Sequence, residues 1–160
     1  MRRVRLLAMV AAAGWLAAAC SSSPTTFDLT SASVDPQYWC PGGAKNAPYD
    51  VHATIAAHNG TSSAVNIESV TAEMTLTAVK GSWLEKVGDR YEANTVKFEP
   101  SRVAAGSSAT IKVTIPSACT SGSYGSSLSS TGEYRVTVRV ITSTGVHAIS
   151  ASNQHQILAA

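Results

Sequence analysis

The sequence is poor in the features on which catalysis and nucleic-acid binding usually depend. Charged residues make up 14% of the 160 residues and are spread singly along the chain, so the basic cluster of a nucleic-acid interface is absent. It contains no G-x-S-x-G nucleophile elbow, no phosphate-binding loop and no dinucleotide fingerprint. We therefore expect a protein that is not an enzyme, needs no cofactor and binds no nucleic acid.

Metal ligands are equally sparse. His52 and His58 fall on one face of an expected strand, but six residues of strand separate them by about 20 Å, too far to share an ion. His147 and His155 are further apart still along the chain. A blue-copper site needs a Cys, two His and usually a Met close together, and no Met follows Cys119. The sequence therefore predicts no metal site.

No apolar run reaches the roughly 20 residues that span a bilayer. The first five residues include three arginines, a fourteen-residue apolar run covers 6–19, and small residues precede Cys20. This order is that of a secretory signal peptide. Removing residues 1–19 leaves 9 of the 12 basic residues against 10 acidic ones, a net charge of −1.

The stretch "LAAAC" resembles the lipobox of bacterial lipoproteins, whose cysteine receives a diacylglycerol and becomes the acylated first residue. Here Leu16 stands one place early and Ala17 occupies its usual position, which leaves ordinary secretory cleavage near Ala19 as an alternative. The Ser/Thr-rich residues that follow have the composition of a flexible linker. We expect a lipoprotein signal peptide over 1–19, lipidation of Cys20 and a tether over 20–26.

The resemblance also implies a location outside the cytoplasm, attached to the cell envelope through the lipid. Ser21 follows the cysteine, which in a bacterium with two membranes is similar to the pattern of outer-membrane lipoproteins.

With Cys20 lipidated, Cys40 and Cys119 remain in a compartment that permits oxidation. A bridge between them would close a loop of about 80 residues and contribute roughly 4 kcal/mol on the chain-entropy model. Two separate thiols are the alternative. We expect the disulfide.

Strand patterns dominate the rest of the chain. Residues 49–58 alternate, with Val51, Ala53, Ile55 and Ala57 on one face. Asn59-Gly60 then favours a tight hairpin turn, although Asn59-Gly60-Thr61 is also a glycosylation sequon. Further strands are expected over 64–81 with a change of inward face near Ser69, over 91–100, over 108–115 ending at Pro116, over 133–142 and over 146–158.

About seven short strands separated by turns indicate an all-β protein, an antiparallel sandwich. The chain over 27–158 resembles immunoglobulin-like and fibronectin type III-like modules. The stretch "VAAGSSATIKVTIP" is similar to their fifth strand, and "TGEYRVTV" to their sixth, with Tyr134 in the place of the tyrosine corner. The chain departs from immunoglobulin domains at Met74 or Leu76, where they have Trp, and at Val136, where they have Cys.

The resemblance implies one immunoglobulin-like β-sandwich over 27–160. It places Cys40 after the first strand and Cys119 before the sixth, at the same end of the sandwich. It also implies a noncatalytic binding or structural module with a protein or envelope partner. A carrier of a small ligand or metal, using Trp39, Trp83 or histidines on different strands, is the alternative.

Aromatic residues supply the candidate binding site. Tyr38 and Trp39 precede Cys40, and Trp83 lies in an irregular stretch. Trp and Tyr are enriched at binding hot spots, but Tyr38 and Trp39 could equally cover the core beside the disulfide, the interpretation we favour. Tyr124, in a Gly/Ser-rich loop, is expected to anchor that loop.

Overall fold

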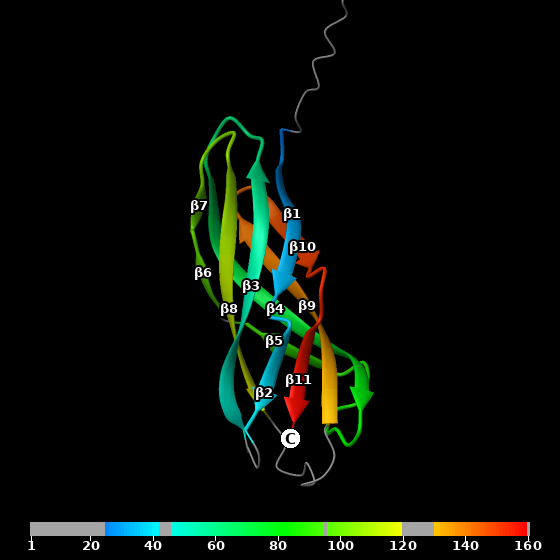
Figure 1. Cartoon of the computed structure of the whole chain (residues 1–160). Coiled ribbons are helices and arrows are strands. Elements are labelled where there is room, and N and C mark those ends of the chain that lie inside the picture. The colour runs from blue at the N-terminus through cyan, green and yellow to red at the C-terminus, as the bar shows by residue number, and fades with distance from the viewer. Residues whose placement is uncertain (1–24, 42–45, 95, 120–129, 160) are drawn as a thin grey trace, which may run out of the picture.

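A computed structural model describes residues 25–41, 46–94, 96–119 and 130–159, and in these residues the chain forms eleven strands and no helix. The strands form an elongated sandwich of two sheets (Figure 1). The first sheet has the order β1 (Phe27–Val34), β3 (Ala47–Asn59), β8 (Ser108–Cys119) and β6 (Lys97–Glu99).

The second sheet has the order β2 (Gln37–Cys40), β11 (His155–Ala159), β9 (Ser130–Thr142), β4 (Val65–Lys80) and β5 (Arg90–Ala93). In addition, β10 (Gly145–Ser150) pairs with β9, and β7 (Arg102–Val103) pairs with β4. All pairs are antiparallel except β2 with β11.

This strand order is that of an immunoglobulin-like sandwich. Strands β1, β3, β8 and β6 occupy the places of strands A, B, E and D, and β4, β9 and β10/β11 those of C, F and G. The predicted all-β immunoglobulin-like fold is therefore confirmed. The eleven strands exceed the expected seven because the first strand, the last strand and the strand expected over 91–100 are each divided in two, and because β7 is an additional short strand.

Alternating side chains build the core between the sheets. In β3, Val51, Ala53, Ile55 and Ala57 are buried as predicted. Each fully buried Val or Ile contributes roughly 1.5–3 kcal/mol. In β4 the inward phase changes at a register shift between Ile67 and Ser69, the bulge that the sequence predicts near Ser69.

The predicted hairpin at Asn59-Gly60 is wrong. Strands β3 and β4 lie in different sheets, so the chain crosses the sandwich there instead of reversing within one sheet. The Asn59 side chain is buried, and its Nδ2 donates to the carbonyl oxygens of Ser63, Val103 and Ala104 at 2.9–3.2 Å. Asn59 therefore holds the crossover loop and is not available as a glycosylation acceptor.

Two strand limits also differ from expectation. Strand β8 continues through Pro116 to Cys119. Its neighbour β6 pairs only as far as Thr114, and no other described strand pairs with the edge beyond it, so Pro116 removes no ladder hydrogen bond there. The expected strand over 91–100 is two strands, β5 and β6, because the chain changes sheets between them.

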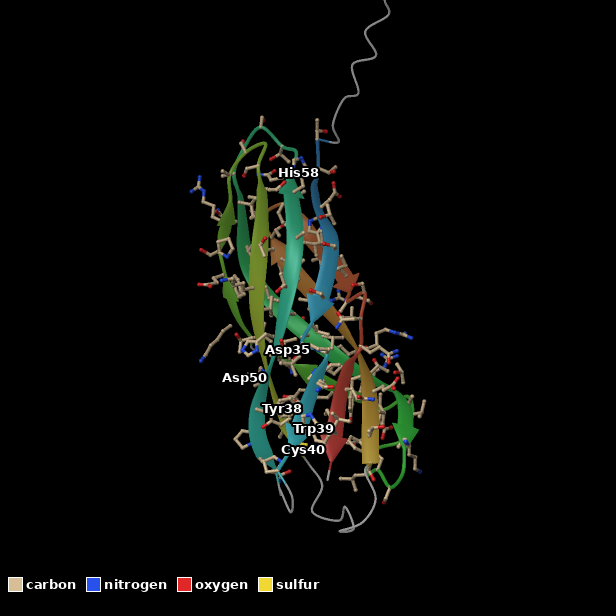
Figure 2. The ribbon with its side chains drawn as sticks, in the orientation of Figure 1. Asp35, Tyr38, Trp39, Cys40, Asp50 and His58 are labelled. Carbon is tan, nitrogen blue, oxygen red and sulfur yellow. A yellow bond between two sulfur atoms is a disulfide. The ribbon has the colours of Figure 1, made fainter. Side chains whose placement is uncertain are left out.

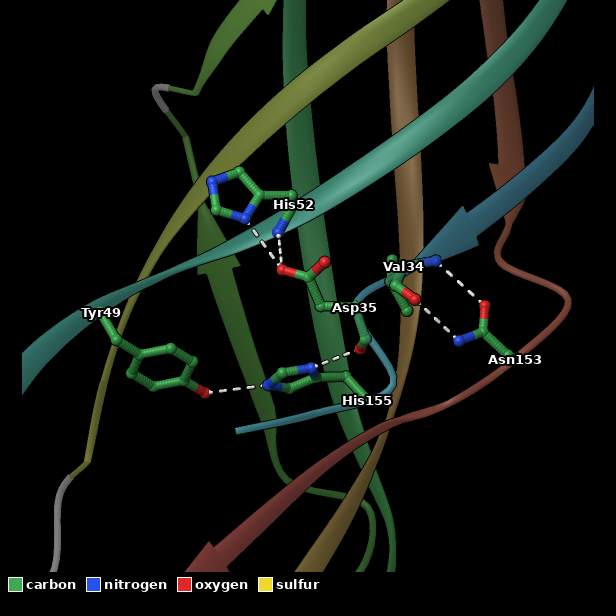
Figure 3. A network of polar contacts seen from close by, with 6 residues as sticks. All are labelled: Val34, Asp35, Tyr49, His52, Asn153 and His155. Atoms are coloured by element: carbon green, nitrogen blue, oxygen red, sulfur yellow. Dashed lines mark hydrogen bonds and ion pairs between the residues drawn. The ribbon is translucent and has the colours of Figure 1, made fainter. Parts of the chain in front are cut away.

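The first and last strands break at the same level of the sandwich. After β1 the chain crosses at Asp35-Pro36 into the second sheet as β2, and residues 151–154 separate β10 from β11. The Asn153 side chain joins the two breaks: its Oδ1 accepts from Val34 N at 3.0 Å and its Nδ2 donates to Val34 O at 2.8 Å (Figure 3). The expected single strand over 146–158 is therefore two.

Candidate functional site

The short strand β2 carries three of the residues singled out in the sequence (Figure 2). Tyr38 turns inward and stacks on Tyr49 of the opposite sheet, with ring centroids 3.9 Å apart. Trp39 turns outward and is 60% exposed. The two neighbouring aromatic residues therefore have different surroundings: Tyr38 covers the core, and Trp39 lies on the surface.

Cys40 and Cys119 form the predicted disulfide. Both are the last residues of strands, β2 and β8, where loop positions were expected. Because β2 and β8 belong to different sheets, the bond joins the two layers covalently at one end of the sandwich. Immunoglobulin domains instead connect strands B and F; here the strand F position, Val136, is buried opposite Met74.

Trp83 folds back from the loop after β4 into the open end of the core. Its Nε1 donates to the Tyr134 hydroxyl at 3.1 Å, and that hydroxyl donates to Glu85 Oε2 at 3.5 Å. A Cβ on Gly132 would lie 2.5 Å from both Cε2 and Cζ2 of Trp83 and 2.9 Å from Nε1. Three adjacent ring atoms at such similar distances mean that the indole face covers Gly132.

A pocket of about 190 Å³ lies between the two sheets at the disulfide end. Its aromatic walls are Trp83, Tyr91 and Tyr134, and the disulfide and Met74 contribute further apolar surface. The Tyr91 hydroxyl donates to Pro116 O at 2.9 Å and so links β5 to β8 across the opening. Three further hollows lie on the outer faces of the sheets, lined largely by polar side chains.

A polar network surrounds the crossover from β1 to β2 (Figure 3). The Asp35 carboxylate accepts from the His52 backbone N–H and from His52 Nδ1, both at 2.9 Å. The Asp35 carbonyl lies 2.7 Å from His155 Nδ1, and His155 Nε2 lies 3.3 Å from the Tyr49 hydroxyl. A carbonyl can only accept, so Nδ1 carries the proton and Nε2 accepts from Tyr49.

Burial governs the protonation of this network. Desolvation lowers the pKa of His155 below its ordinary value, although its contacts with Asp35 act in the opposite direction. Desolvation raises the pKa of Tyr49 to about 12. At neutral pH both side chains are therefore uncharged, and the network holds the strand crossover without a buried charge.

The predicted site residues are brought together only in part. Trp83 and the disulfide share the pocket, whereas Trp39 faces outward from β2. Among the residues that the structure describes, no three His, Cys, Asp or Glu side chains are grouped as metal ligands, and no helix there could cross a membrane. Cys20 and Tyr124 lie outside the described residues.

No protein-family model matches the chain, and no curated protein matches it significantly. Among solved structures, the chain is similar to PapD-like domain 7 (an ASH domain) of human CEP192, with 10% identity over 99% of this chain and 96% of that one, and a TM-score of 0.30.

It is also similar to AggA, the major subunit of aggregative adherence fimbriae type I of Escherichia coli, with 9% identity over 84% of this chain and 95% of that one, and a TM-score of 0.35. A third similar structure is the CooA pilin subunit of enterotoxigenic Escherichia coli, with 11% identity over 82% of this chain and 98% of that one, and a TM-score of 0.29. Similarities this low assign no function, and the immunoglobulin-like assignment rests on the strand order.

Two residues of the pocket, Glu85 and Tyr91, were not identified from the sequence. Glu85 lies in the irregular stretch after β4, where alternation is lost, and Tyr91 lies in β5, whose four residues are too few for alternation to indicate which side chains face the core. The concentration of Trp83, Glu85 and Tyr91 within nine residues is the one local signal that could have been used. His155 and Asp35 were likewise missed as partners, because 120 residues separate them.

Proposed function

We propose that the protein is a noncatalytic binding module, held outside the cytoplasm by a lipid on Cys20, that presents its disulfide-bonded end to a partner. The signal-like residues 1–19 and the tether composition of 20–26 support the anchor. The disulfide supports an oxidising compartment. The end with the disulfide is called the distal end below, and the opposite end, where β1 begins, the tether end (Figure 1).

The distribution of exposed apolar side chains carries the proposal. Among the described residues, the large exposed hydrophobics number six, and five of them belong to segments at or leading to the distal end: Trp39, Val79, Leu84, Val87 and Tyr91. Leu84 and Val87 are 68% and 62% exposed. Apolar side chains gathered on one part of a surface are typical of interaction sites, whereas single ones are ordinary.

The sixth, Val146, provides a comparison. It is 57% exposed and precedes His147, whose ring contacts Phe27 at the tether end with centroids 5.1 Å apart. Val146 thus matches Leu84 in exposure and apolar character but lies at the other end of the molecule.

A noncatalytic role fits the placement of the groups with shifted pKa values. The Tyr49 hydroxyl is hydrogen-bonded to His155, and His155 is also hydrogen-bonded to the backbone carbonyl of Asp35 at the strand crossover. Neither lines any of the four hollows described above. A catalytic acid or base must reach substrate, directly or through one water.

Photocrosslinking in the native cell tests the proposal. A photoreactive amino acid replaces Leu84 or, as the matched control, Val146, in the full chain with its signal peptide. We expect a discrete crosslinked product from position 84 and none from position 146. Equal products from both positions, or no product from position 84 in a correctly localised protein, would contradict a distal binding surface. The Cys20→Ser variant should leave the membrane fraction.

A further inference from the structure

Strand β8 has an unpaired edge at the distal end. The strand runs to Cys119, whereas its neighbour β6 pairs only with residues 112–114. No other strand in the part of the chain that the structure describes pairs with this side of β8. Residues 116–119 of the same strand line the distal pocket. The pocket therefore lies beside a strand edge that another extended backbone could join.

Two prolines show which backbone groups face this edge. In the pairing of β3 with β8, Pro48 lies opposite Ala118 and Asp50 lies opposite Pro116. Proline has no N–H, so these cannot be the pairs that exchange two hydrogen bonds, and in the alternate pairs the backbone groups point away from the partner strand. The Tyr91 hydroxyl reaches Pro116 O from that outer side. The N–H and carbonyl of Ala118 consequently point toward the unpaired edge.

These two groups favour a peptide as the occupant over a free apolar molecule. On this side of β8, no hydrogen bond joins Ala118 to any described residue. Backbone N–H and carbonyl groups cost free energy when they are removed from water without a partner. An apolar molecule in the pocket would cover them unpaired, whereas an antiparallel strand bonds both through a single residue.

The pocket selects an uncharged side chain. Its volume of about 190 Å³ exceeds that of the cavity of about 150 Å³ that accepts benzene. The Trp83 N–H and the Tyr91 hydroxyl are donated to acceptors of the protein, and Trp83, Glu85 and Tyr134 each make a further interaction. A charged side chain would be desolvated against groups that already have partners, so an aromatic or branched alkyl group fits best.

We propose that an extended segment of a partner protein pairs antiparallel with β8 at Ala118 and inserts one uncharged aromatic or branched alkyl side chain into the distal pocket. The inference rests on the proposed binding function and deepens it, because it names the conformation and chemistry of the partner. Alternation in β8 places Ala118 with Pro116 on the outer face. The residue opposite Ala118 therefore points outward, and its neighbour enters the pocket.

A blocked tripeptide, phenylalanine between two threonines, is the probe. It is titrated into the ¹⁵N-labelled mature chain, which starts at residue 20 and carries Cys20→Ser, and amide shifts are followed by NMR. We expect saturable shifts of the Ala118 amide and the Trp83 indole. Serine or lysine in place of the phenylalanine should weaken binding at least about tenfold.

Methylated peptides test the backbone pairing. Methylation of both threonine nitrogens removes the donor to the Ala118 carbonyl and should weaken binding about three- to tenfold. Methylation of the phenylalanine nitrogen is the matched control, because that N–H points away from β8, and it should have little effect. Toluene, a ring without a backbone, should bind more weakly than the tripeptide.

A substitution in the protein tests the same contact from the other side. Ala118→Pro removes the N–H that faces the edge and leaves the ladder with β3 intact, because the pair with Pro48 exchanges no hydrogen bond. It should weaken tripeptide binding about three- to tenfold and leave toluene binding unchanged. A thermal melt verifies that the variant folds, and if it does not, the methylated peptides decide.

Several outcomes would overturn the inference. One is failure of the tripeptide to bind the folded protein. Another is affinity that survives threonine methylation or the change of phenylalanine to serine, and a third is toluene binding as tightly as the tripeptide. Shifts of Ala118 that grow with protein concentration alone would identify a second copy as the occupant. Crosslinking at position 84 is read independently, so either result can fail while the other stands.

Discussion

Loss of the Cys40–Cys119 disulfide should cost the domain a large part of its stability. The bond joins residues 79 apart in sequence, and on the chain-entropy model such a loop lowers the entropy of the unfolded chain by the equivalent of about 4.5 kcal/mol at 25 °C. Measured losses for native bridges are about 2–5 kcal/mol. The folded state of a typical domain is only about 5–15 kcal/mol below the unfolded one, so reduction should bring this protein close to unfolding.

Urea denaturation of the mature chain with Cys20→Ser provides the assay. The free energy of unfolding is measured for the oxidised protein, for the same protein with reductant, and for Cys40→Ala with Cys119→Ala. We expect a loss of about 3–4.5 kcal/mol on reduction, a fall in melting temperature of roughly 10–20 °C, and a steeper dependence on urea because the unfolded chain can expand.

The comparison between reduction and substitution separates the two causes of destabilisation. Reduction retains both buried sulfur atoms, whereas the double alanine variant also leaves a small cavity beside the pocket, so it should be the less stable of the two. Reductant should have no effect on the alanine variant. A loss below about 1 kcal/mol on reduction, with complete thiol labelling afterwards, would refute the argument from loop entropy.

Three further predictions concern buried side chains. Burial lowers the pKa of His155 in the folded state, so just below the ordinary pKa of about 6.5 the unfolded state binds more protons than the folded state. The free energy of unfolding should therefore fall as the pH drops below that value and become constant beneath the folded pKa. Urea denaturation between pH 8 and pH 5 should show a flatter dependence on pH for His155→Gln than for the unsubstituted protein. Gly132→Ala places a methyl group against the Trp83 indole, which should lower the free energy of unfolding by about 1–3 kcal/mol and expose the tryptophan to solvent. In a Trp83→Ala background the same substitution should have little effect, and a double-mutant cycle measures the difference. Asn59→Ala removes the amide that holds the crossover loop and should cost roughly 2–3 kcal/mol in urea denaturation, whereas an unchanged midpoint would show that water replaces the amide.

Alternation along the chain was sufficient to predict the sandwich, because a strand buried on one face repeats every two residues wherever it lies. Strands β3 and β9 follow from this pattern almost to their ends. The pattern does not say which sheet a strand joins, so Asn59-Gly60 had the chemistry of a hairpin turn and yet stands at a crossing between sheets.

The candidate site was less accessible to sequence reasoning. Trp83 and the disulfide were recognised from residue type, but Glu85 enters the pocket from a stretch without periodicity, and Tyr91 enters it from the four-residue strand β5, which is too short to show which side faces the core. Similarly, the pairing of His155 with Asp35 and Tyr49 depends on breaks in the first and last strands that coincide only in the folded chain. Contacts between such distant segments leave no local signature in a single sequence.

The position of the disulfide determines how the domain would respond to mechanical tension. A pull between the tether and a partner held at the distal end enters at Phe27 and runs along β1 and β2 to Cys40, where the covalent bond transfers it to Cys119. Along β1 the hydrogen bonds to β3 lie across the direction of force and are loaded together, in shear. After they yield, the chain before Cys40 extends, and a partner that holds Leu84 then loads the segments 41–83 and 85–118 in parallel, because the bond joins their far ends. With the partner on the proposed distal surface, the bond therefore shortens the possible extension and divides the load between two segments of the chain.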